Sequence, residues 1–253
     1  GGAGAGMRTA ILTDLHANRE ALEAVLEHAQ DQRIDRHALL GDFVGYGADP
    51  GWVVDRVRRL LAEGGVAVQG NHDLATVRGP SPDMRPEPAQ VIGWTRQQLD
   101  AAQLDFLATL PLQHEADGVL FVHANAWAPA DWGYILGRFD AVRSLHATRA
   151  WLTCCGHVHE PRLYHLSNVG RAGDFVPTPG VPVPLLAQRQ WLVIPGAVGQ
   201  PRDGDPAAGY AILDHADGTM TWWRVPYDHE TAARKIRDAG LPLALAERLA
   251  HGV

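Results

Sequence analysis

Short polar clusters recur along the first 160 residues of the chain, and each one combines carboxylate, amide or imidazole side chains. Oxygen and imidazole ligands of this kind suit borderline divalent ions such as manganese, iron and zinc. A lone Asp-x-His pair or a single histidine is common by chance, so no one cluster is informative by itself. Together the clusters indicate a metal site. The side chains concerned are Asp14, His16, Asp42, Asn71, His72, His123, His157 and His159.

Each cluster directly follows a short apolar run that predicts a buried strand. Open α/β sheets place their ligand sites at the carboxyl ends of the strands, so these strand ends can converge on one spot. Gly41, Gly70 and Gly156 lie beside three of the clusters, where a residue without a Cβ lets the backbone turn sharply and approach an ion. The expected strands are 8–13, 38–40, 66–69, 119–122 and 151–155.

The stretch CCGHVHEP at 154–161 offers two cysteines and two histidines as ligands. In an extended segment, His157 and His159 would project to the same side with Cα atoms about 6.6 Å apart, from a rise of about 3.3 Å per residue. That separation suits ligands of two neighbouring ions. Cys154 and Cys155 fall within the predicted strand, and the usual paired cysteine spacings are absent. We therefore expect the histidines to bind metal and the cysteines to be buried.

Amphipathic segments between the strands predict helices. Asn18 is placed to cap a helix whose apolar stripe runs from Ala21 to Ala29, and Pro50 opens a second helix. Farther along, we expect a loop over 79–88, a helix over 89–99 and two short helices over 230–249.

The later part of the chain has a different pattern. The runs 191–194, 210–213 and 220–225 predict strands, with Asp217 and Gly218 forming a hairpin turn between the last two. No helical segment separates these strands. This arrangement favours a second, more antiparallel sheet stacked on the first.

The composition is ordinary for one globular domain, with 46% hydrophobic and 20% charged residues in a chain of 253. We expect that domain to cover 7–253, and we interpret GGAGAG at 1–6 as a remnant ahead of Met7. No window resembles a membrane span or an export signal, and the two cysteines are adjacent, so we expect a cytoplasmic protein without a disulfide framework. The net charge of −7 disfavours long nucleic acid as a partner.

In this order, the clusters resemble the motifs of the calcineurin-like metallophosphoesterase superfamily. A later segment, PGAVGQPRDGDP at 195–206, resembles the small bacterial phosphodiesterase branch, which is related to the diadenosine tetraphosphatases. The resemblance implies an α/β fold with two stacked mixed sheets flanked by helices, a four-layer αββα sandwich. The matching motifs are DLH at 14–16, GDFVG at 41–45, GNHD at 70–73, VH at 122–123 and GHVH at 156–159.

The resemblance also implies two divalent transition-metal ions, manganese or iron, with zinc as a further candidate. A hydroxide that bridges the ions would attack the phosphorus, and His72 would stabilise or protonate the leaving oxygen. Carried over by position, the first ion takes Asp14, His16 and His159, the second takes Asn71, His123 and His157, and Asp42 bridges the two.

The chain departs from this pattern in its second motif. The serine/threonine phosphatases and the diadenosine tetraphosphatases of the superfamily carry a phosphate-binding arginine there, whereas this chain has Gly45 and Tyr46. Arg202 is a candidate replacement, and Tyr46 is a candidate substrate contact; the alternatives are a solvated arginine and a packing tyrosine. Trp127, Trp132 and Tyr134 could stack on a nucleobase, although packing is the more common role.

We therefore expect a dinuclear metallophosphoesterase, most simply a phosphodiesterase, that acts on a small phosphate ester, with nucleotides among the candidates. Phosphomonoesterase, serine/threonine-type phosphatase and dinucleoside polyphosphate phosphatase activities are the alternatives. A non-catalytic metal-binding scaffold is disfavoured because His72 and all the expected ligands are present. A nuclease is disfavoured by the acidic charge. The sequence leaves the oligomeric state open.

Overall fold

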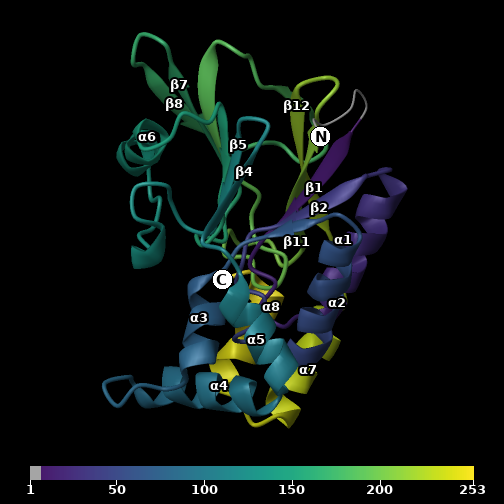
Figure 1. Cartoon of the computed structure of the whole chain (residues 1–253). Coiled ribbons are helices and arrows are strands. Elements are labelled where there is room, and N and C mark those ends of the chain that lie inside the picture. Colours follow the sequence, from purple (N-terminus) through teal and green to yellow (C-terminus); the bar gives the residue numbers. More distant parts are fainter. Residues whose placement is uncertain (1–6) are drawn as a thin grey trace.

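Two mixed six-stranded sheets form the centre of the molecule in a computed structural model that describes residues 7–253 (Figure 1). The remnant inferred at 1–6 lies outside the described residues. The first sheet has the order β3-β2-β1-β11-β12-β9. Its strands are β1 (Arg8–Leu12), β2 (Arg36–Leu39), β3 (Val66–Ala67), β9 (Val183–Pro184), β11 (Ala208–Asp214) and β12 (Thr219–Val225).

The second sheet has the order β4-β5-β6-β10-β7-β8. In both sheets parallel strands lie beside antiparallel ones: β1 pairs parallel with β2, and β5 pairs parallel with β6. The strands of the second sheet are β4 (Gln113–Ala116), β5 (Val119–Val122), β6 (Leu152–Cys154), β7 (Arg162–Ser167), β8 (Ala172–Phe175) and β10 (Arg189–Ile194).

Helices cover the outer face of each sheet, which completes the predicted four layers. Helices α1 (Arg19–Asp31) and α2 (Pro50–Ala62) pack on the first sheet, and α6 (Arg138–His146) packs on the second. The cap predicted for α1 is present, because the Asn18 side chain accepts a hydrogen bond from the Ala21 N–H at 3.1 Å. No helix within 7–253 is long and apolar enough to cross a bilayer.

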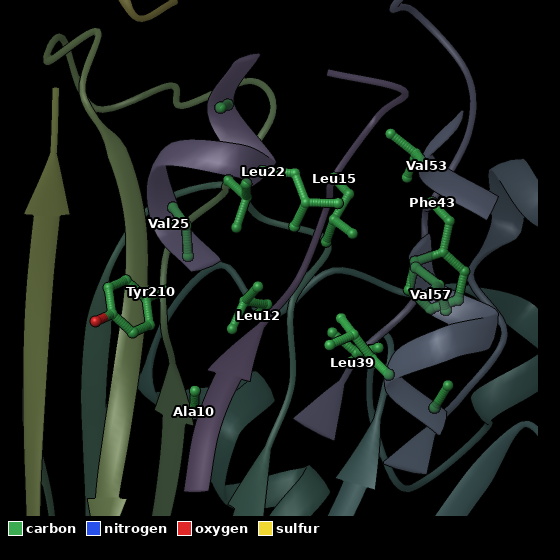
Figure 2. Packing of buried hydrophobic residues seen from close by; sticks show 14 of the residues in the cluster. Ala10, Leu12, Leu15, Leu22, Val25, Leu39, Phe43, Val53, Val57 and Tyr210 are labelled. Carbon is green, nitrogen blue, oxygen red and sulfur yellow. The ribbon is translucent and has the colours of Figure 1, made fainter. Parts of the chain in front are cut away.

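The core follows the two-residue period of the strands. In β1, Leu12 packs against α1 on the outer face, while Ile11 points into the core between the sheets. Figure 2 shows Leu12, Leu22 and Val25 gathered between β1 and α1. Because strands buried on both faces tolerate few polar residues, β1 ends in an apolar run over 10–12. Truncating the fully buried Leu12 to alanine would cost about 2–5 kcal/mol.

Five more helices gather near one end of the sheets, at the bottom of Figure 1. Val91 of α4 packs with residues of the last two helices in a separate hydrophobic cluster that includes Ala232, Ile236, Leu245 and Leu249. The two short helices predicted over 230–249 are α7 and α8, and Gly240 and Pro242 lie between them. The five helices are α3 (Asn71–Arg78), α4 (Pro86–Gln97), α5 (Ala101–Thr109), α7 (His229–Asp238) and α8 (Leu243–His251).

The late strands do not form a second sheet of their own, so that expectation was wrong. Strands β11 and β12 join the first sheet, where Ile11 of β1 faces Ala211 of β11 in antiparallel register, and β10 joins the second sheet beside β6. The hairpin turn near Gly218 was predicted because it is local, whereas sheet membership depends on pairing between segments about 200 residues apart. The expected loop 79–88 is also shorter, because α4 begins at Pro86.

Candidate metal centre

The polar clusters converge at the ends of the strands, as the order of the motifs predicts. Two groups of side chains have potential ligand atoms within 4.8 Å of one another. Asp42 belongs to both groups. Asn71 adjoins the second, because its Oδ1 lies 3.2 Å from His123 Nε2. The first group is Asp14, His16, Asp42 and His159, and the second is Asp42, His123 and His157.

Both aspartates direct one carboxylate oxygen into the cluster and anchor the other. Asp14 Oδ2 accepts the N–H of His157 at 2.9 Å, and Asp42 Oδ1 accepts the N–H of His72 at 2.9 Å. The other oxygen of Asp14 is buried without a hydrogen-bond donor and lies 3.1 Å from His159 Nε2. A buried carboxylate oxygen without a donor is costly unless a cation compensates it. The donor set therefore fits divalent ions.

Three of the histidines present the same ring nitrogen to the cluster. In each case Nδ1 lies within hydrogen-bond range of a main-chain carbonyl, which can only accept, so Nδ1 carries a proton and Nε2 is left to face the cluster. Carbonyl groups of this kind fix the orientation of metal-binding histidines. The pairs are His16 with Val44 at 3.2 Å, His123 with Leu40 at 2.7 Å and His159 with Gln200 at 2.7 Å.

His157 is oriented the opposite way. Its Nε2 lies 2.9 Å from the carbonyl oxygen of Trp132, which leaves Nδ1 to face the cluster. The Tyr134 ring lies parallel to the His157 ring, with centroids 3.8 Å apart and an angle of 12° between the planes. One loop, 126–137, thus holds this histidine from two sides. Sequence reasoning did not identify this role for the loop, because it depends on a main-chain carbonyl.

Several ligand residues have left-handed backbone conformations. The φ angles of His157 and His159 are 73° and 67°, so the segment 157–159 is not extended, and the predicted extended geometry was wrong. One residue earlier, Gly156 packs so closely that a Cβ would overlap Thr13 Oγ1 and Asp14 Oδ2. Backbone strain of this kind costs about 1–3 kcal/mol per residue and tends to persist at functional sites.

Asp73 is a buried residue of the site whose role sequence reasoning missed. Its carboxylate accepts main-chain N–H groups from Gly70 at 2.8 Å, from Asp42 at 2.9 Å and from Phe43 at 2.9 Å. These bonds join the loop after β2 to the loop after β3. Gly70 is required at this junction, because a Cβ there would overlap Asp42 Oδ1. The GNHD motif contained the signal, since an aspartate three residues after a glycine can close such a turn.

The electrostatics of the cluster favour bound positive charge. Burial opposes ionisation of Asp14 and Asp42, but nearby histidines, chiefly His159 for Asp14 and His123 for Asp42, hold both pKa values well below the usual range. Burial lowers the pKa of His123, but Asp42 and Asp14 outweigh it and raise that pKa to about 10. Two buried carboxylates that stay ionised give the cluster negative charge, which bound divalent ions would compensate.

His72 lies beside the cluster without belonging to either ligand group. Its ring centroid is 5.0 Å from that of His16 and 4.6 Å from that of Tyr46. Burial lowers the pKa of His72 to about 4 despite the neighbouring Asp42, so the imidazole is neutral at pH 7. Gly45 leaves room for it, because a Cβ there would lie 2.8 Å from His72 Nδ1.

Tyr46 and Arg202 both lie at the rim of the cluster. The Tyr46 ring is 4.5 Å from the His16 ring, and burial raises the pKa of its hydroxyl while Arg202 acts against that shift. The Arg202 main-chain N–H donates to the His159 carbonyl at 3.1 Å. Its guanidinium donates to Gln200 Oε1 at 3.1 and 2.8 Å. Arg202 is half-buried, and its main chain is hydrogen-bonded to the candidate ligand His159. It is therefore not a freely solvated arginine.

Of the remaining candidate residues, the two cysteines and Trp127 pack against neighbouring side chains, whereas Tyr134 is partly exposed. Cys154 and Cys155 point into the hydrophobic cores on opposite faces of the second sheet, and burial raises both thiol pKa values. Trp127 packs beneath Arg143, whose guanidinium carbon is 4.7 Å from the ring centroid. Tyr134 keeps 45% of its surface exposed, so one of the loop aromatics remains available to a ligand.

Comparisons with known proteins agree with the fold. The profile of the calcineurin-like phosphoesterase superfamily domain matches residues 7–218. An uncharacterized protein of Methanocaldococcus jannaschii is 35% identical over 249 residues, covering 96% of this chain and 97% of that protein. The crystal structure of a metallophosphoesterase from Sphaerobacter thermophilus has a TM-score of 0.87 and 37% identity, covering 98% of this chain and 100% of that one.

A hypothetical protein of Pyrococcus horikoshii shares the fold, with a TM-score of 0.78 at 18% identity and coverage of 98% and 99% of the two chains.

The chain belongs to the calcineurin-like phosphoesterase superfamily. It is a hydrolase of phosphate esters, and its buried aspartate and histidine cluster is a site for divalent metal ions. Residues 219–253, which form β12, α7 and α8, lie beyond the matched domain but within the length shared with the Sphaerobacter protein.

Proposed function

We propose that the protein is a dinuclear metal-dependent phosphodiesterase that acts on small phosphate esters, with nucleotides among the candidate substrates. The main support is the position of Asp42, the residue common to both ligand groups. A carboxylate in that position can bridge two ions about 3.5–4 Å apart. Asp14, His16 and His159 would hold the first ion, and Asn71, His123 and His157 the second.

When bound, two divalent ions activate water and neutralise charge on the phosphoryl oxygens. The protein keeps the ligands in place through the main-chain carbonyls behind each histidine. His72 is held by the hydrogen bond from its N–H to Asp42. Its neutral ring retains one ring N–H, which would donate a hydrogen bond to the leaving oxygen of the ester. Arg202 and Tyr46 would contact the phosphate at the rim.

Manganese or iron is proposed for the ions, with zinc as the alternative. Mixed oxygen and imidazole ligands suit all three, and neither buried cysteine contributes a thiolate. A cytoplasmic location is part of the proposal and is supported by the two unpaired thiols of Cys154 and Cys155.

The decisive experiment replaces the shared ligand. Asp42→Asn and His123→Gln should abolish manganese-dependent cleavage of bis(p-nitrophenyl) phosphate and lower the bound metal measured by mass spectrometry. His146→Gln changes an exposed histidine on α6 and serves as the matched control. Full turnover in either ligand variant would contradict the assignment. A parallel screen of monoesters, cyclic nucleotides, linear diesters and dinucleoside polyphosphates would rank the substrate classes.

A further inference from the structure

Lys235 of α7, the only lysine in the chain, joins the starts of two helices that lie far from it in the sequence. Its Nζ donates to Glu20 Oε2 in the first turn of α1 at 2.7 Å and to Asp49 Oδ2 at the start of α2 at 3.0 Å. The lysine keeps 32% of its side-chain surface exposed, and the two carboxylates keep 16% and 24%. Because water screens partly buried charges less than exposed ones, these contacts restrict how α1 and α2 lie relative to each other.

The carboxylate of Asp49 bonds to Lys235 instead of capping its own helix. Asp49 occupies the N-cap position of α2, where an aspartate side chain ordinarily accepts a main-chain N–H of the first turn. That bond is not made, and the side chain accepts from the lysine instead. Glu20 also bonds to the lysine through one oxygen, while its other oxygen is buried without a donor among the described residues. Both acidic side chains thus serve a contact between distant segments.

The two helices joined in this way follow two loops that carry metal-binding residues. The loops run side by side, because the His16 N–H donates to the Asp42 carbonyl at 2.9 Å and the Asp49 N–H donates to the Ala17 carbonyl at 3.0 Å. Their contact is close: a Cβ on Gly47 would lie 2.1 Å from the His16 carbonyl oxygen. A shift of either loop would therefore move the other.

Both loops also hold ligand residues in left-handed backbone conformations. The φ angles of Asp14, His16 and Asp42 are 55°, 44° and 54°. Each such residue costs about 1–3 kcal/mol and persists only where the surrounding structure holds it. Asp73 holds the loop after β2 near Asp42. The lysine contact holds both loops at their other ends, where α1 and α2 begin.

We propose that Lys235 is a positioning residue that sets the affinity of the first metal ion. By joining Glu20 to Asp49, it keeps the two strained loops at a fixed distance. This inference rests on the proposed function, which assigns Asp14 and His16 of these loops to the first ion. The ligands assigned only to the second ion follow β3, β5 and β6, and in the described part of the chain the lysine side chain bonds to none of them.

Manganese titrations of proteins with one intact ligand set test this role. His123→Gln removes a ligand of the second ion, and His159→Gln removes a ligand of the first. Adding Lys235→Met to His123→Gln should weaken the remaining manganese site about 10-fold, the lower end of the effect of losing an outer-shell partner. Adding it to His159→Gln should leave the manganese affinity unchanged. Isothermal titration calorimetry measures both, and Arg237→Met, at an exposed position of α7, is the control.

A role in fold stability alone would weaken both manganese sites equally, so equal losses in the two backgrounds would overturn the positioning role. An unchanged first site would overturn it as well. Lys235→Arg, which keeps the positive charge, should recover most of the affinity. If Lys235→Met does not fold, Asp49→Asn keeps an acceptor oxygen without the charge and should cause a smaller loss confined to the first site; no loss there would contradict the proposal.

The proposed function has a separate readout, which is cleavage of bis(p-nitrophenyl) phosphate by the wild type. If the wild type binds manganese but does not cleave the diester, the proposed function fails and the titrations still decide the role of Lys235. If the wild type binds no manganese, both proposals fail.

Discussion

The main-chain N–H of Asp42 donates to the carboxylate of Asp73 across 2.9 Å. The residue that both ligand groups share is thereby held by a buried carboxylate from the neighbouring loop. Asp73 also accepts the N–H groups of Gly70 and Phe43, so a single side chain sets the distance between the loops after β2 and β3. The bridging position therefore depends on a residue that is not itself in a ligand group.

Asp73→Asn should weaken manganese binding and phosphodiesterase activity by about 10- to 100-fold, the usual effect of losing an outer-shell partner of a metal site. The amide turns at least one N–H donor toward the main-chain N–H groups that the carboxylate now accepts. Asp83→Asn, in an exposed loop, is the control. Activity titrated against free manganese provides the measurement, and coincident curves for Asp73→Asn and the wild type would disprove the role.

His72→Asn should lower the rate by about 10²- to 10⁴-fold for esters with poor leaving groups and by much less for p-nitrophenyl esters, because a nitrophenolate needs little help to depart. Metal content should remain that of the wild type, since His72 lies outside both ligand groups. Rates for a series of aryl diesters with different leaving-group pKa values test this. An equal loss of rate for all esters in the series would show that His72 does not assist the departure of the leaving group.

Tyr134→Ala should weaken binding of the second ion by about 2- to 10-fold, because a stacked aromatic pair contributes about 0.5–1.5 kcal/mol. The ring lies parallel to His157, a member of the second ligand group. Tyr134→Phe keeps the stack and is the matched control. Electron paramagnetic resonance of manganese-loaded protein distinguishes singly from doubly occupied sites. The stacking role fails if the alanine and phenylalanine variants fill both sites equally.

Acid should destabilise the fold partly through His37, far from the metal centre. Burial, followed by Arg56, lowers the pKa of His37 to about 4 from 6.5. The unfolded chain therefore binds a proton between pH 6.5 and 4 that the folded chain does not, so this contribution to stability is present above pH 6.5 and is lost as the pH falls toward 4. At roughly 1.4 kcal/mol per pKa unit, and with a reduction for partial exposure of the ring, the loss is about 2 kcal/mol.

His37→Gln should reduce that loss, which urea unfolding at pH 7 and pH 4.5 measures as a smaller difference in unfolding free energy. His146→Gln, at an exposed position, is the control. Parallel pH dependences for the wild type and His37→Gln would show that His37 does not contribute.

Local features of the fold could be predicted from the sequence where a few neighbouring residues specify them. The Asn18 cap, the start of α2 at Pro50 and the turn at Gly218 are local, and the structure has all three. Helix α5 was missed although its start carries a local signal: Asp100 and Gln103 cap each other reciprocally. The membership of β11 in the first sheet could not be predicted, because it depends on register with β1 at the other end of the chain.

By itself, the sequence determined the chemical identity of the candidate site, because the residue types and their positions after apolar strands restrict the ligands whatever the detailed geometry. Only the tertiary structure decided which ring nitrogen each histidine presents and how Asp73 holds Asp42. These relationships join segments that are up to 83 residues apart or use main-chain carbonyls. Contacts between distant segments and contacts to main-chain carbonyls leave no pattern in the local sequence, because both depend on how the chain folds back on itself.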